Sequence, residues 1–396
     1  MSETQLPSES LARGATRARA GRFIYLACPW SPMGGGMFRV ADYLIQAQAF
    51  DAPAQSAELR PLDTRGAGHA VFSLWVLLTA LVRIVRGRLQ GELAGVHVNM
   101  AERLSVWRKG AIVVVCRAIG VPVLLHLHAA QMHAFYAGLP APLRALTRRV
   151  FQLADGVVVL GDSARQFVTE ELRVPAERVE VVINGVPEPA EARRIRQPGE
   201  PQRVLFLGNL SERKGVSDLL RALAHPGFRT LPVAVTLAGG GDVAGYQALA
   251  RSLGVDHLVR FEGWCDQAQV ARLMARADVM VLPSYDEGLP LAILEALGNG
   301  VAVVCTPVGE IPGVLSDGVE ALFVPPGDSE ALAGRLQDVL RSPALREWLE
   351  RNGRARYEEQ FSLQRFFASV ARIHRKFFGI AAQPRPPRAP VPAPGP

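Results

Sequence analysis

The chain has 396 residues, of which 49% are hydrophobic and 20% are charged, with a formal net charge of +7. This length exceeds what one hydrophobic core ordinarily fills, so we expect a globular protein of two domains. The nearest approach to a membrane span, Ala70–Val82, is shorter than the roughly 20 residues that cross a bilayer, and the polar N-terminus does not resemble a secretory signal. Four scattered cysteines without a C-x-x-C pair favour reduced thiols, so we predict a cytoplasmic protein.

Apolar runs typical of buried strands alternate with helical patterns along the chain. In the first half these runs are Phe23–Cys28, Val96–Asn99, Val121–Leu127, Gly156–Leu160 and Val179–Ile183. In the second half they are Arg203–Leu207, Val233–Ala238, Val259–Glu262, Val279–Pro283, Val301–Cys305 and Ala321–Val324. Near-continuous hydrophobic strands separated by helices indicate parallel sheets that are covered on both faces. We therefore predict an α/β fold with two Rossmann-like, doubly wound domains.

The polar and proline-containing segment 187–202 is the best domain boundary. It separates an N-terminal domain at 21–188 from a C-terminal domain at 200–360. An amphipathic pattern predicts a further helix at 361–380. We expect residues 1–20 and the proline-rich tail 383–396 to be disordered.

A glycine run follows the first predicted strand. Gly34, Gly35 and Gly36 stand between that strand and a helix predicted over Arg39–Ala49. Glycines at a helix N-terminus allow the backbone to approach a ligand closely. The run is not G-x-G-x-x-G and lacks a well-placed acidic residue further on, which disfavours a dinucleotide dehydrogenase. A flexible connecting loop is the alternative interpretation.

Histidines occur near the ends of two predicted strands of the first half. His126 and His128 alternate along one strand and so share a face, and His128 is nearer the end, where ligands bind in open α/β sheets. His97 and Asn99 end another strand and could line the same cleft, whereas His133 is a loop candidate on weaker grounds. A structural role is the alternative for each histidine.

The second half has its own glycine-containing turn, Gly208–Gly215, after its first strand. Arg213 and Lys214 in this turn precede a helix that begins near Val216. Two cations at a helix start are unfavourable for the helix, but they suit a bound diphosphate. An exposed basic loop is the alternative.

The segment 283–298 carries two carboxylates in a Glu287-x7-Glu295 spacing. Between them, Gly288-Leu289-Pro290 forms a tight turn and the start of an apolar helix, where Pro290 suits the first helical position. Free N–H groups at that helix start can hold a phosphate, and the carboxylates can accept hydrogen bonds from sugar hydroxyls. This loop therefore offers contacts for both halves of a sugar nucleotide.

Two absences in the sequence limit the chemistry. There is no D-x-D motif and no His/Cys cluster with ligand spacing, so we expect no metal. There is also no G-x-S-x-G elbow and no Walker loop.

Basic residues gather beside the apolar run Ala70–Val82. The first group is Arg83, Arg86, Arg88, Arg103, Arg108 and Lys109, and a second is Arg144, Arg148 and Arg149. An apolar helix edged with cations can lie on an anionic membrane face, so we expect peripheral contact with the inner face of the cytoplasmic membrane. A solvated basic face is the alternative. No aromatic-interleaved basic motif indicates a nucleic-acid partner.

Together these motifs resemble the family 4 retaining glycosyltransferases, which have the GT-B fold. The resemblance rests on the Glu287-x7-Glu295 segment and is reinforced by Arg213-Lys214-Gly215, Asn184-Gly185-Val186 and Val308-Gly309-Glu310. The branch that builds bacterial surface polysaccharides and exopolysaccharides is also similar, through His97-Val98-Asn99, Ser105, Arg108-Lys109 and the segment Leu125–Ala129.

The resemblance implies a role for each candidate residue. Its catalytic set is His128, Glu287, Lys214 and Arg213. Its donor-binding set is Gly35, Gly36, Asn209, Gly288, Leu289, Pro290 and Glu295. Its acceptor-side candidates are His97, Asn99 and His133. The two cations would neutralise the leaving diphosphate, Glu287 would bind sugar hydroxyls, Glu295 would hold the ribose side, and the helix 361–380 would cross back to the first domain.

The implied reaction moves a sugar from a UDP- or GDP-sugar, a co-substrate, to a lipid-linked oligosaccharide such as a polyprenyl-diphosphate-linked glycan. No cofactor is implied. One departure matters, because the family often has arginine where this chain has Asn209. The alternatives are therefore a catalytically silent binding subunit of a polysaccharide assembly, and a nucleotide-sugar epimerase on the same fold.

Overall fold

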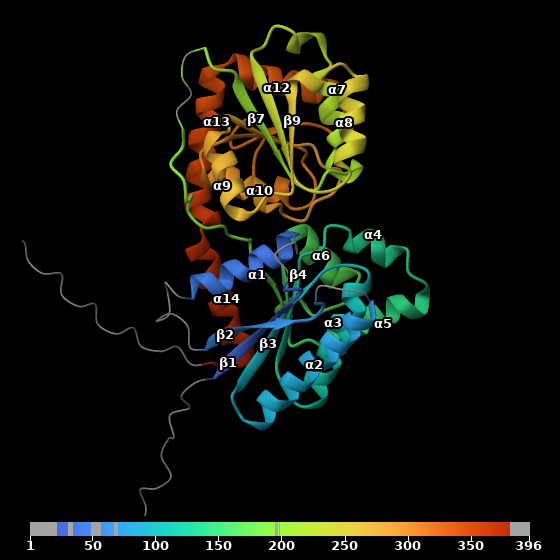
Figure 1. Cartoon of the computed structure of the whole chain (residues 1–396). Coiled ribbons are helices and arrows are strands. Elements are labelled where there is room, and N and C mark those ends of the chain that lie inside the picture. Colours follow the sequence, from blue (N-terminus) through green and yellow to red (C-terminus); the bar gives the residue numbers. More distant parts are fainter. Residues whose placement is uncertain are drawn as a thin grey trace, which may run out of the picture.

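The computed structural model describes residues 22–30, 35–48, 57–66, 70–194, 197 and 199–380. The segments predicted to be disordered, 1–20 and 383–396, and the first residue of the glycine run, Gly34, lie outside these ranges. Two parallel sheets, each with six strands, form the centres of an N-terminal and a C-terminal domain (Figure 1).

The N-terminal sheet has the strand order β2-β1-β3-β4-β5-β6, with every strand parallel to its neighbour. Its strands are β1 (Phe23–Cys28), β2 (Glu58–Asp63), β3 (Leu93–Met100), β4 (Val123–Leu127), β5 (Gly156–Val159) and β6 (Val179–Val181). Its helices are α1 (Gly35–Ala47), α2 (Ala70–Leu89), α3 (Leu104–Ala118), α4 (Met132–Ala137), α5 (Ala141–Leu153) and α6 (Asp162–Glu170).

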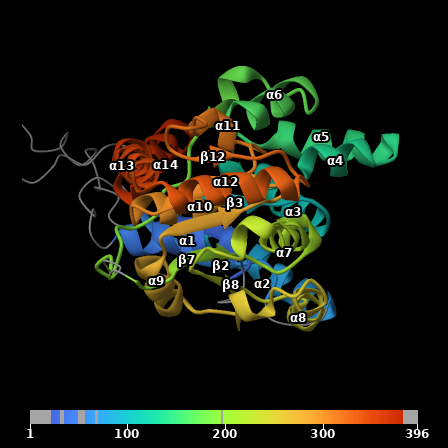
Figure 2. The same cartoon turned by 90° about the horizontal axis from the view of Figure 1, so that it is seen from above.

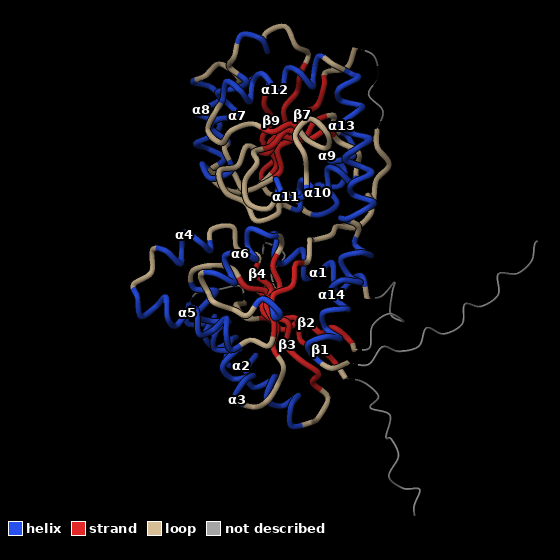
Figure 3. Tube along the Cα trace, turned by 180° about the vertical axis from the view of Figure 1, so that it is seen from behind, coloured by secondary structure: helices blue, strands red, loops and turns tan. Residues whose placement is uncertain are grey.

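The C-terminal sheet has the order β12-β11-β10-β7-β8-β9 and is likewise parallel. Its strands are β7 (Gln202–Leu207), β8 (Val233–Ala238), β9 (Val259–Gly263), β10 (Val279–Leu282), β11 (Ala302–Cys305) and β12 (Leu322–Phe323). Its α-helices are α7 (Val216–Leu223), α8 (Val243–Ser252), α9 (Gln267–Arg276), α10 (Leu291–Gly298), α11 (Ile311–Val314), α12 (Ser329–Arg341) and α13 (Pro343–Arg356). Helices surround the strands of each domain, as Figure 3 shows.

The predicted α/β fold with two doubly wound sheets is confirmed, and the strand that the pattern missed is β2. In its sequence Glu-Leu-Arg-Pro-Leu-Asp, at the edge of the sheet, only the two leucines are buried. Pro61 cannot donate to a ladder, which suits an edge strand and conceals it in a search for continuous apolar runs. The first helix also begins earlier than predicted, at Gly35 rather than Arg39.

The C-terminal helix α14 (Leu363–Phe378) leaves the C-terminal domain and packs on the N-terminal sheet, beside α1 (Figure 1). Figure 2 looks at the molecule from above, where α13 and α14 overlap because the π-helical segment Tyr357–Phe361 joins the end of one to the start of the other. Glycines permit this close packing, because a Cβ at Gly95 would meet the ring of Phe378 at 2.6 Å. The chain passes between the domains twice, near Val186 and near Phe361. The backbone N–H of Val186 donates to the carbonyl of Phe361 at 2.9 Å, so a hydrogen bond joins these two passages.

Candidate active site

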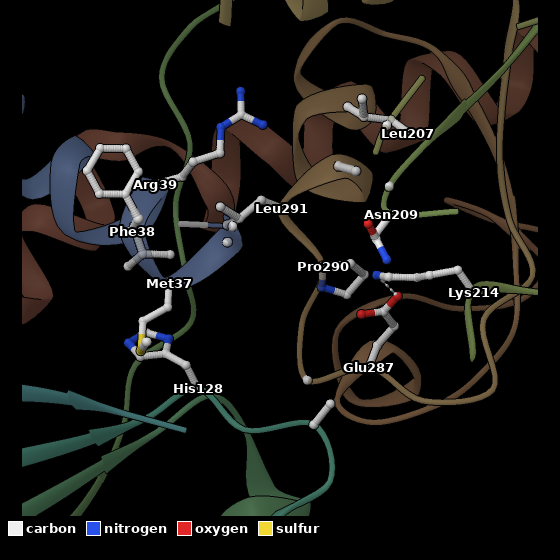
Figure 4. Close-up of a pocket in the computed structure, with 18 of the residues that line it drawn as sticks. Met37, Phe38, Arg39, His128, Leu207, Asn209, Lys214, Glu287, Pro290 and Leu291 are labelled. Carbon is white, nitrogen blue, oxygen red and sulfur yellow. Dashed lines mark hydrogen bonds and ion pairs between the residues drawn. The ribbon is translucent and has the colours of Figure 1, made fainter. Parts of the chain in front are cut away.

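The carboxyl ends of both sheets face a cleft of about 1080 Å³ between the domains. This is where ligands bind in open α/β folds, because the loops that follow parallel strands meet there. The N-terminal wall comes from the start of α1 and the loops after β3 and β4, and the C-terminal wall from the loops after β7, β8, β9 and β10. Figure 4 shows His128 on the first wall, opposite Lys214 and Glu287 on the second.

Lys214 and Glu287 form an ion pair at the C-terminal wall of the cleft. The carboxylate of Glu287 also accepts a hydrogen bond from the hydroxyl of Ser284 at 2.7 Å. Both charged side chains are nearly buried, since 13% of Lys214 and 8% of Glu287 remain exposed. An ion pair at low exposure keeps a defined geometry, so the two groups are fixed relative to each other before any ligand arrives.

Arg213 lies next to this pair and braces the loop that carries Glu287. Its guanidinium donates to the carbonyl of Asp286 at 2.7 Å, while the backbone N–H of Tyr285 donates to the carbonyl of Arg213 at 2.8 Å. Arg213 also lines the cleft. The structure therefore brings Arg213, Lys214 and Glu287 together, as the motifs predicted. One N–H group of the Arg213 guanidinium is already hydrogen-bonded to the protein backbone.

The turn Gly288-Leu289-Pro290 lines the cleft and leads into α10. Pro290 is the residue before the helix rather than its first residue, so the predicted start is one position early. Gly309 supports the turn from below with φ +61°, where a Cβ would overlap the carbonyl oxygens of Glu287 and Gly288. The N–H of Glu310 donates to the Gly288 carbonyl at 2.9 Å and keeps residue 309 against this backbone. Because a side chain would not fit there, glycine is needed at position 309.

Three consecutive glycines after β8 belong to the same wall, and they are not among the residues predicted from the sequence to form the site. Gly239, Gly240 and Gly241 line the cleft beside Asn209. A Cβ at Gly239 would overlap the carbonyl oxygen of Gly208, so the loops after β7 and β8 touch through their backbones. The signal was present in the sequence as a glycine run directly after a strand, the same pattern that drew attention to Gly34–Gly36.

Comparison with known proteins identifies the chain. Residues 188–356 match the family described as Glycosyl transferases group 1. Phosphatidyl-myo-inositol mannosyltransferase of Mycobacterium leprae is 31% identical over 274 residues, which cover 67% of this chain and 69% of that protein. The chain belongs to this glycosyltransferase family.

Two further proteins are similar to this chain. The uncharacterized glycosyltransferase MJ1607 of Methanocaldococcus jannaschii is 27% identical over 55% of this chain and 59% of its own length, so the chain spans less than two thirds of that relative. The crystal structure of Anabaena Alr3699/HepE in complex with UDP-glucose superposes with a TM-score of 0.66 at 17% identity, covering 89% of this chain and 99% of that one. At that identity the structural likeness establishes the GT-B fold alone.

Glu295 of this glycosyltransferase lies on α10 and contacts the N-terminal domain rather than the open cleft. Its Oε1 accepts a hydrogen bond from the Tyr43 hydroxyl at 2.9 Å and lies 3.5 Å from the Arg39 guanidinium. Burial raises the pKa of the Glu295 carboxyl, although Arg39 opposes the rise. Its Oε2 is buried without a hydrogen-bond partner among the described residues, so one acceptor remains unused at this contact between the domains.

His128 is the histidine that the fold places at the cleft. It lines the N-terminal wall, and its Nε2 donates to the Asn99 Oδ1 at 2.8 Å. Burial lowers the pKa of His128 to about 3, with smaller contributions from His97 and the Lys109 ammonium. The imidazole is therefore neutral at physiological pH, and with its proton on Nε2 it presents Nδ1 as an acceptor.

His97 and Asn99 do not line the cleft, which corrects the sequence-based expectation. Both are buried on the face of β3 that α14 covers. His97 shares hydrogen bonds with His374 of α14 at 2.8 Å and with His126 at 3.1 Å, so it is part of a buried histidine chain. Asn99 touches His128 and can act on the site only through it. Strand periodicity gave the shared face of these residues but not the helix that covers it.

His133 lies in a neighbouring pocket of about 470 Å³ that adjoins Glu287 and Gly288. Its ring packs edge-on against Phe167 of α6, with the ring centroids 5.4 Å apart. In the same pocket, Glu310 of the C-terminal domain accepts hydrogen bonds from the backbone N–H groups of Ser163 and Ala164 at 3.3 and 2.7 Å. Glu310 thus caps α6 of the opposite domain, a contact that no local sequence pattern predicts.

The buried histidines predict a marked loss of stability on mild acidification. Burial lowers the pKa of His97 to about 4, and it also lowers the pKa values of His126 and His374. The unfolded chain therefore binds more protons than the folded one as pH falls below about 6.5, and each such histidine costs about 2 kcal/mol of stability by pH 5. We expect a much lower urea midpoint at pH 5 than at pH 7.

The matched variant for this experiment is His374→Gln, which keeps a hydrogen-bonding group toward His97 but does not titrate. Its urea midpoint should change less between pH 7 and pH 5 than that of the parent chain. An unchanged difference would show that the histidine chain does not set the acid sensitivity.

Proposed function

We propose that this protein is a retaining glycosyltransferase that moves a sugar from a UDP- or GDP-sugar to a lipid-linked oligosaccharide in bacterial surface or exopolysaccharide synthesis. The observation that carries the donor part is the Lys214–Glu287 pair beside Arg213, set in glycine-rich loops at one wall of the cleft. Cations suit the diphosphate, and the carboxylate suits sugar hydroxyls. The similarity to Anabaena Alr3699/HepE, whose structure was solved in complex with UDP-glucose, supports a nucleotide-sugar donor.

Bond cleavage at the anomeric carbon places negative charge on the leaving diphosphate. Arg213, Lys214 and the backbone N–H groups near Gly288 and Pro290 are positioned to stabilise that charge, which lowers the barrier without requiring a metal. We propose attack by the acceptor on the same face that the diphosphate leaves, with the departing phosphate taking the acceptor proton. Glu287 then positions the sugar rather than forming a covalent bond, because its carboxylate is held by Lys214 and Ser284.

His128 faces this centre from the opposite wall. As a neutral acceptor it suits a hydroxyl of the transferred sugar, and Asn99 fixes its tautomer. Glu295 does not line the cleft in this structure, so we propose that it holds the ribose in place of Tyr43, after that contact has opened. Asn209 supplies a neutral amide at the cleft where the related enzymes often have a cation, so Arg213 takes a larger share of the diphosphate charge.

The donor is named by a thermal-shift panel of nucleotide sugars on the full chain. A ligand that binds only the folded state raises the melting temperature by mass action, by several degrees at a hundredfold excess over its Kd. We expect one UDP- or GDP-sugar to stand out, and the same compound to support transfer. Binding of no donor would favour the silent binding subunit, and isomerised donor formed without any acceptor would favour the epimerase.

The lipid part of the proposal rests on α2. Its residues Val71, Phe72, Leu74, Trp75, Leu78 and Val82 are all exposed, and Trp75 alone has 61% of its surface accessible. They follow helical spacing along one side, with the exposed Arg83, Arg86 and Arg88 at the C-terminal end of the same helix. None of the described helices combines the length and apolar character that a membrane crossing requires. An apolar face edged by cations is suited to lie on an anionic bilayer.

Replacing Trp75 and Leu78 together by glutamate is expected to release the protein from vesicles. The parent chain should float with vesicles containing phosphatidylglycerol and bind phosphatidylcholine vesicles much less, since each nearby arginine adds about 1 kcal/mol of attraction to an anionic surface. Trp348→Ser, at an exposed tryptophan of α13 in the other domain, is the matched control. Equal flotation of parent and double variant would refute the membrane contact.

A further inference from the structure

Lys109 is a buried lysine for which the proposed reaction has no use. It lies on α3, its side chain is wholly buried, and within the described part of the chain it forms no ion pair. Among the described residues its ammonium donates to the thioether sulfur of Met37, at 3.5 Å. Burial lowers the pKa of Lys109 to about 7, and Arg108 lowers it further while the Cys28 thiol opposes this. An unpaired ammonium in such a place is costly for the fold, so its retention calls for an anionic partner.

The ammonium is separated from the cleft by the side chain of Met37. Met37 stands in the first turn of α1 and lines the cleft, and Figure 4 shows it extending toward His128. Methionine has three rotatable bonds and repacks easily. A small movement of this side chain therefore opens Lys109 to a ligand that enters on the N-terminal side.

Arg103 lies at the start of α3, the helix that carries Lys109, and has an unusual backbone conformation. It precedes α3 with φ 60° and ψ −133°, a region that residues with a Cβ rarely adopt. Arg103 is exposed and lines the cleft. A strained backbone of this kind persists where the surrounding structure fixes the residue. Here the fixed backbone keeps the guanidinium of Arg103 at the N-terminal wall of the cleft.

Two further cations, Arg108 and Arg65, lie near each other in the same domain. The Nε of Arg108 is buried without a hydrogen-bond partner among the described residues, and the charge of Arg65 lowers the pKa of Arg108 after burial itself. The nearby carboxylate of Asp63 is already engaged, because it accepts hydrogen bonds from the backbone N–H groups of Trp30, Arg65 and Gly66. These bonds hold the Asp63 carboxylate on the backbone, so among the described residues the Nε of Arg108 and the ammonium of Lys109 have no carboxylate as a hydrogen-bond partner.

The loop after β2, which carries Arg65, adjoins the start of α2. A Cβ at Gly66 would meet the ring of Phe72 at 2.7 Å, so the loop that carries Arg65 packs directly on the exposed apolar helix. A ligand with its lipid tail at α2 and its sugar in the cleft would pass its charged link over Arg65, Arg108, Arg103 and Lys109.

We propose that Lys109 and Arg103, with Arg108 and Arg65 beside them, bind the phosphate or diphosphate that joins the acceptor sugar to its lipid. This inference rests on the proposed function, since it assigns the acceptor's charged group to a second anion site apart from the donor site at Lys214. Met37 moves aside when that group enters.

The chain has three lysines, Lys109, Lys214 and Lys376, which makes a direct test possible. Lysine labelled with ¹³C at Cε gives three NMR signals, assigned by single Lys→Arg variants, and each signal reports the protonation and surroundings of one ammonium. On the full chain saturated with whichever of UDP or GDP shifts Lys214, inorganic pyrophosphate is expected to shift Lys109 saturably and to raise its measured pKa by about one unit or more. Farnesyl diphosphate should bind at least tenfold more tightly than orthophosphate, which distinguishes a lipid-linked anion from free phosphate.

Failure of the two assignments can be told apart. If neither nucleotide shifts Lys214, the donor site is wrong, and pyrophosphate alone still reports on Lys109. If Lys109 does not respond at pyrophosphate concentrations that saturate Lys214, or responds without saturation, the acceptor-phosphate site is refuted.

A variant adds a second measurement. Lys109→Met keeps the aliphatic volume, and we expect the Kd for farnesyl diphosphate to rise at least tenfold while the nucleotide Kd is unchanged. The melting temperature should stay level or increase, because an unpaired buried charge has been removed. A purely structural lysine would give a lower melting temperature and an unchanged Kd for farnesyl diphosphate. Lys376→Met, on the surface of α14, is the control, and if Lys109→Met does not fold, the titration of the parent chain decides.

Discussion

Replacing Lys214 by methionine should lower kcat/KM for sugar transfer by about 10²–10³-fold, the loss that follows removal of one preorganised group from a developing negative charge. Methionine fills the space of the lysine stem but cannot stabilise the leaving diphosphate. Lys214 stands at the cleft wall, opposite His128 and beside Arg213, so its charge is close to the place where the bond to the diphosphate would break. We expect most of the loss in kcat, because the charge is larger in the transition state than in the bound donor.

The measurement is steady-state transfer with the donor that the thermal-shift panel identifies. Lys376→Met is again the matched control, since the Lys376 ammonium pairs with Glu180 on the surface and does not line the cleft. Parent-like turnover in a folded Lys214→Met variant would remove Lys214 from the proposed mechanism. An equal loss in the control would point to a general effect of lysine replacement.

The fold could be predicted from the sequence because both sheets are buried on two faces. Strand β10 is apolar along its whole length and β4 is interrupted only by His126, and all residues of both strands are buried, so the hydrophobic pattern carries a clear signal. The edge strand β2 was missed for the opposite reason, since only Leu59 and Leu62 of its residues are buried.

Within the candidate site, the sequence was most informative where one loop carries several of the candidate residues. Glu287 and the turn at Gly288 are neighbours in the chain, and the cations at Arg213 and Lys214 follow an equally recognisable strand. What sequence could not supply is contact across the cleft. The bond from Tyr43 to Glu295 joins residues 252 positions apart, and the cap that Glu310 provides for α6 spans 146 positions at Ala164.

Local patterns also do not show which side of a strand a helix will cover. His97 and His128 both follow strand alternation near the carboxyl edge of the sheet, yet α14 buries one and leaves the other at the cleft. Lys109 appeared in the sequence among several basic residues and in the Arg108-Lys109 motif, but its burial could not be predicted, since burial depends on how α3 meets α1. The physical reason is the same in both cases, because desolvation is set by elements distant in sequence.

A double variant can separate the structural from the catalytic part played by Lys214 and Glu287. Lys214→Met alone leaves the Glu287 carboxylate nearly buried with Ser284 as its remaining side-chain partner, and we expect a loss of about 3 kcal/mol of stability. Glu287→Gln alone leaves the ammonium unpaired at a similar cost. Combining both changes removes both charges, so the double variant should be more stable than the sum of the single losses predicts, with a coupling of about 1–3 kcal/mol.

Transfer should not recover with stability. Glutamine at position 287 still offers an amide to a sugar hydroxyl, but the diphosphate lacks the Lys214 charge, so the double variant should remain at least 10²-fold below the parent in kcat/KM. Urea unfolding and transfer assays on the four proteins complete the cycle. Additive stability losses would mean that the ion pair is not formed in solution. Recovered transfer in the double variant would mean that Lys214 serves only to neutralise Glu287, and the stabilisation of the leaving group would then fall to Arg213 and the helix-start N–H groups.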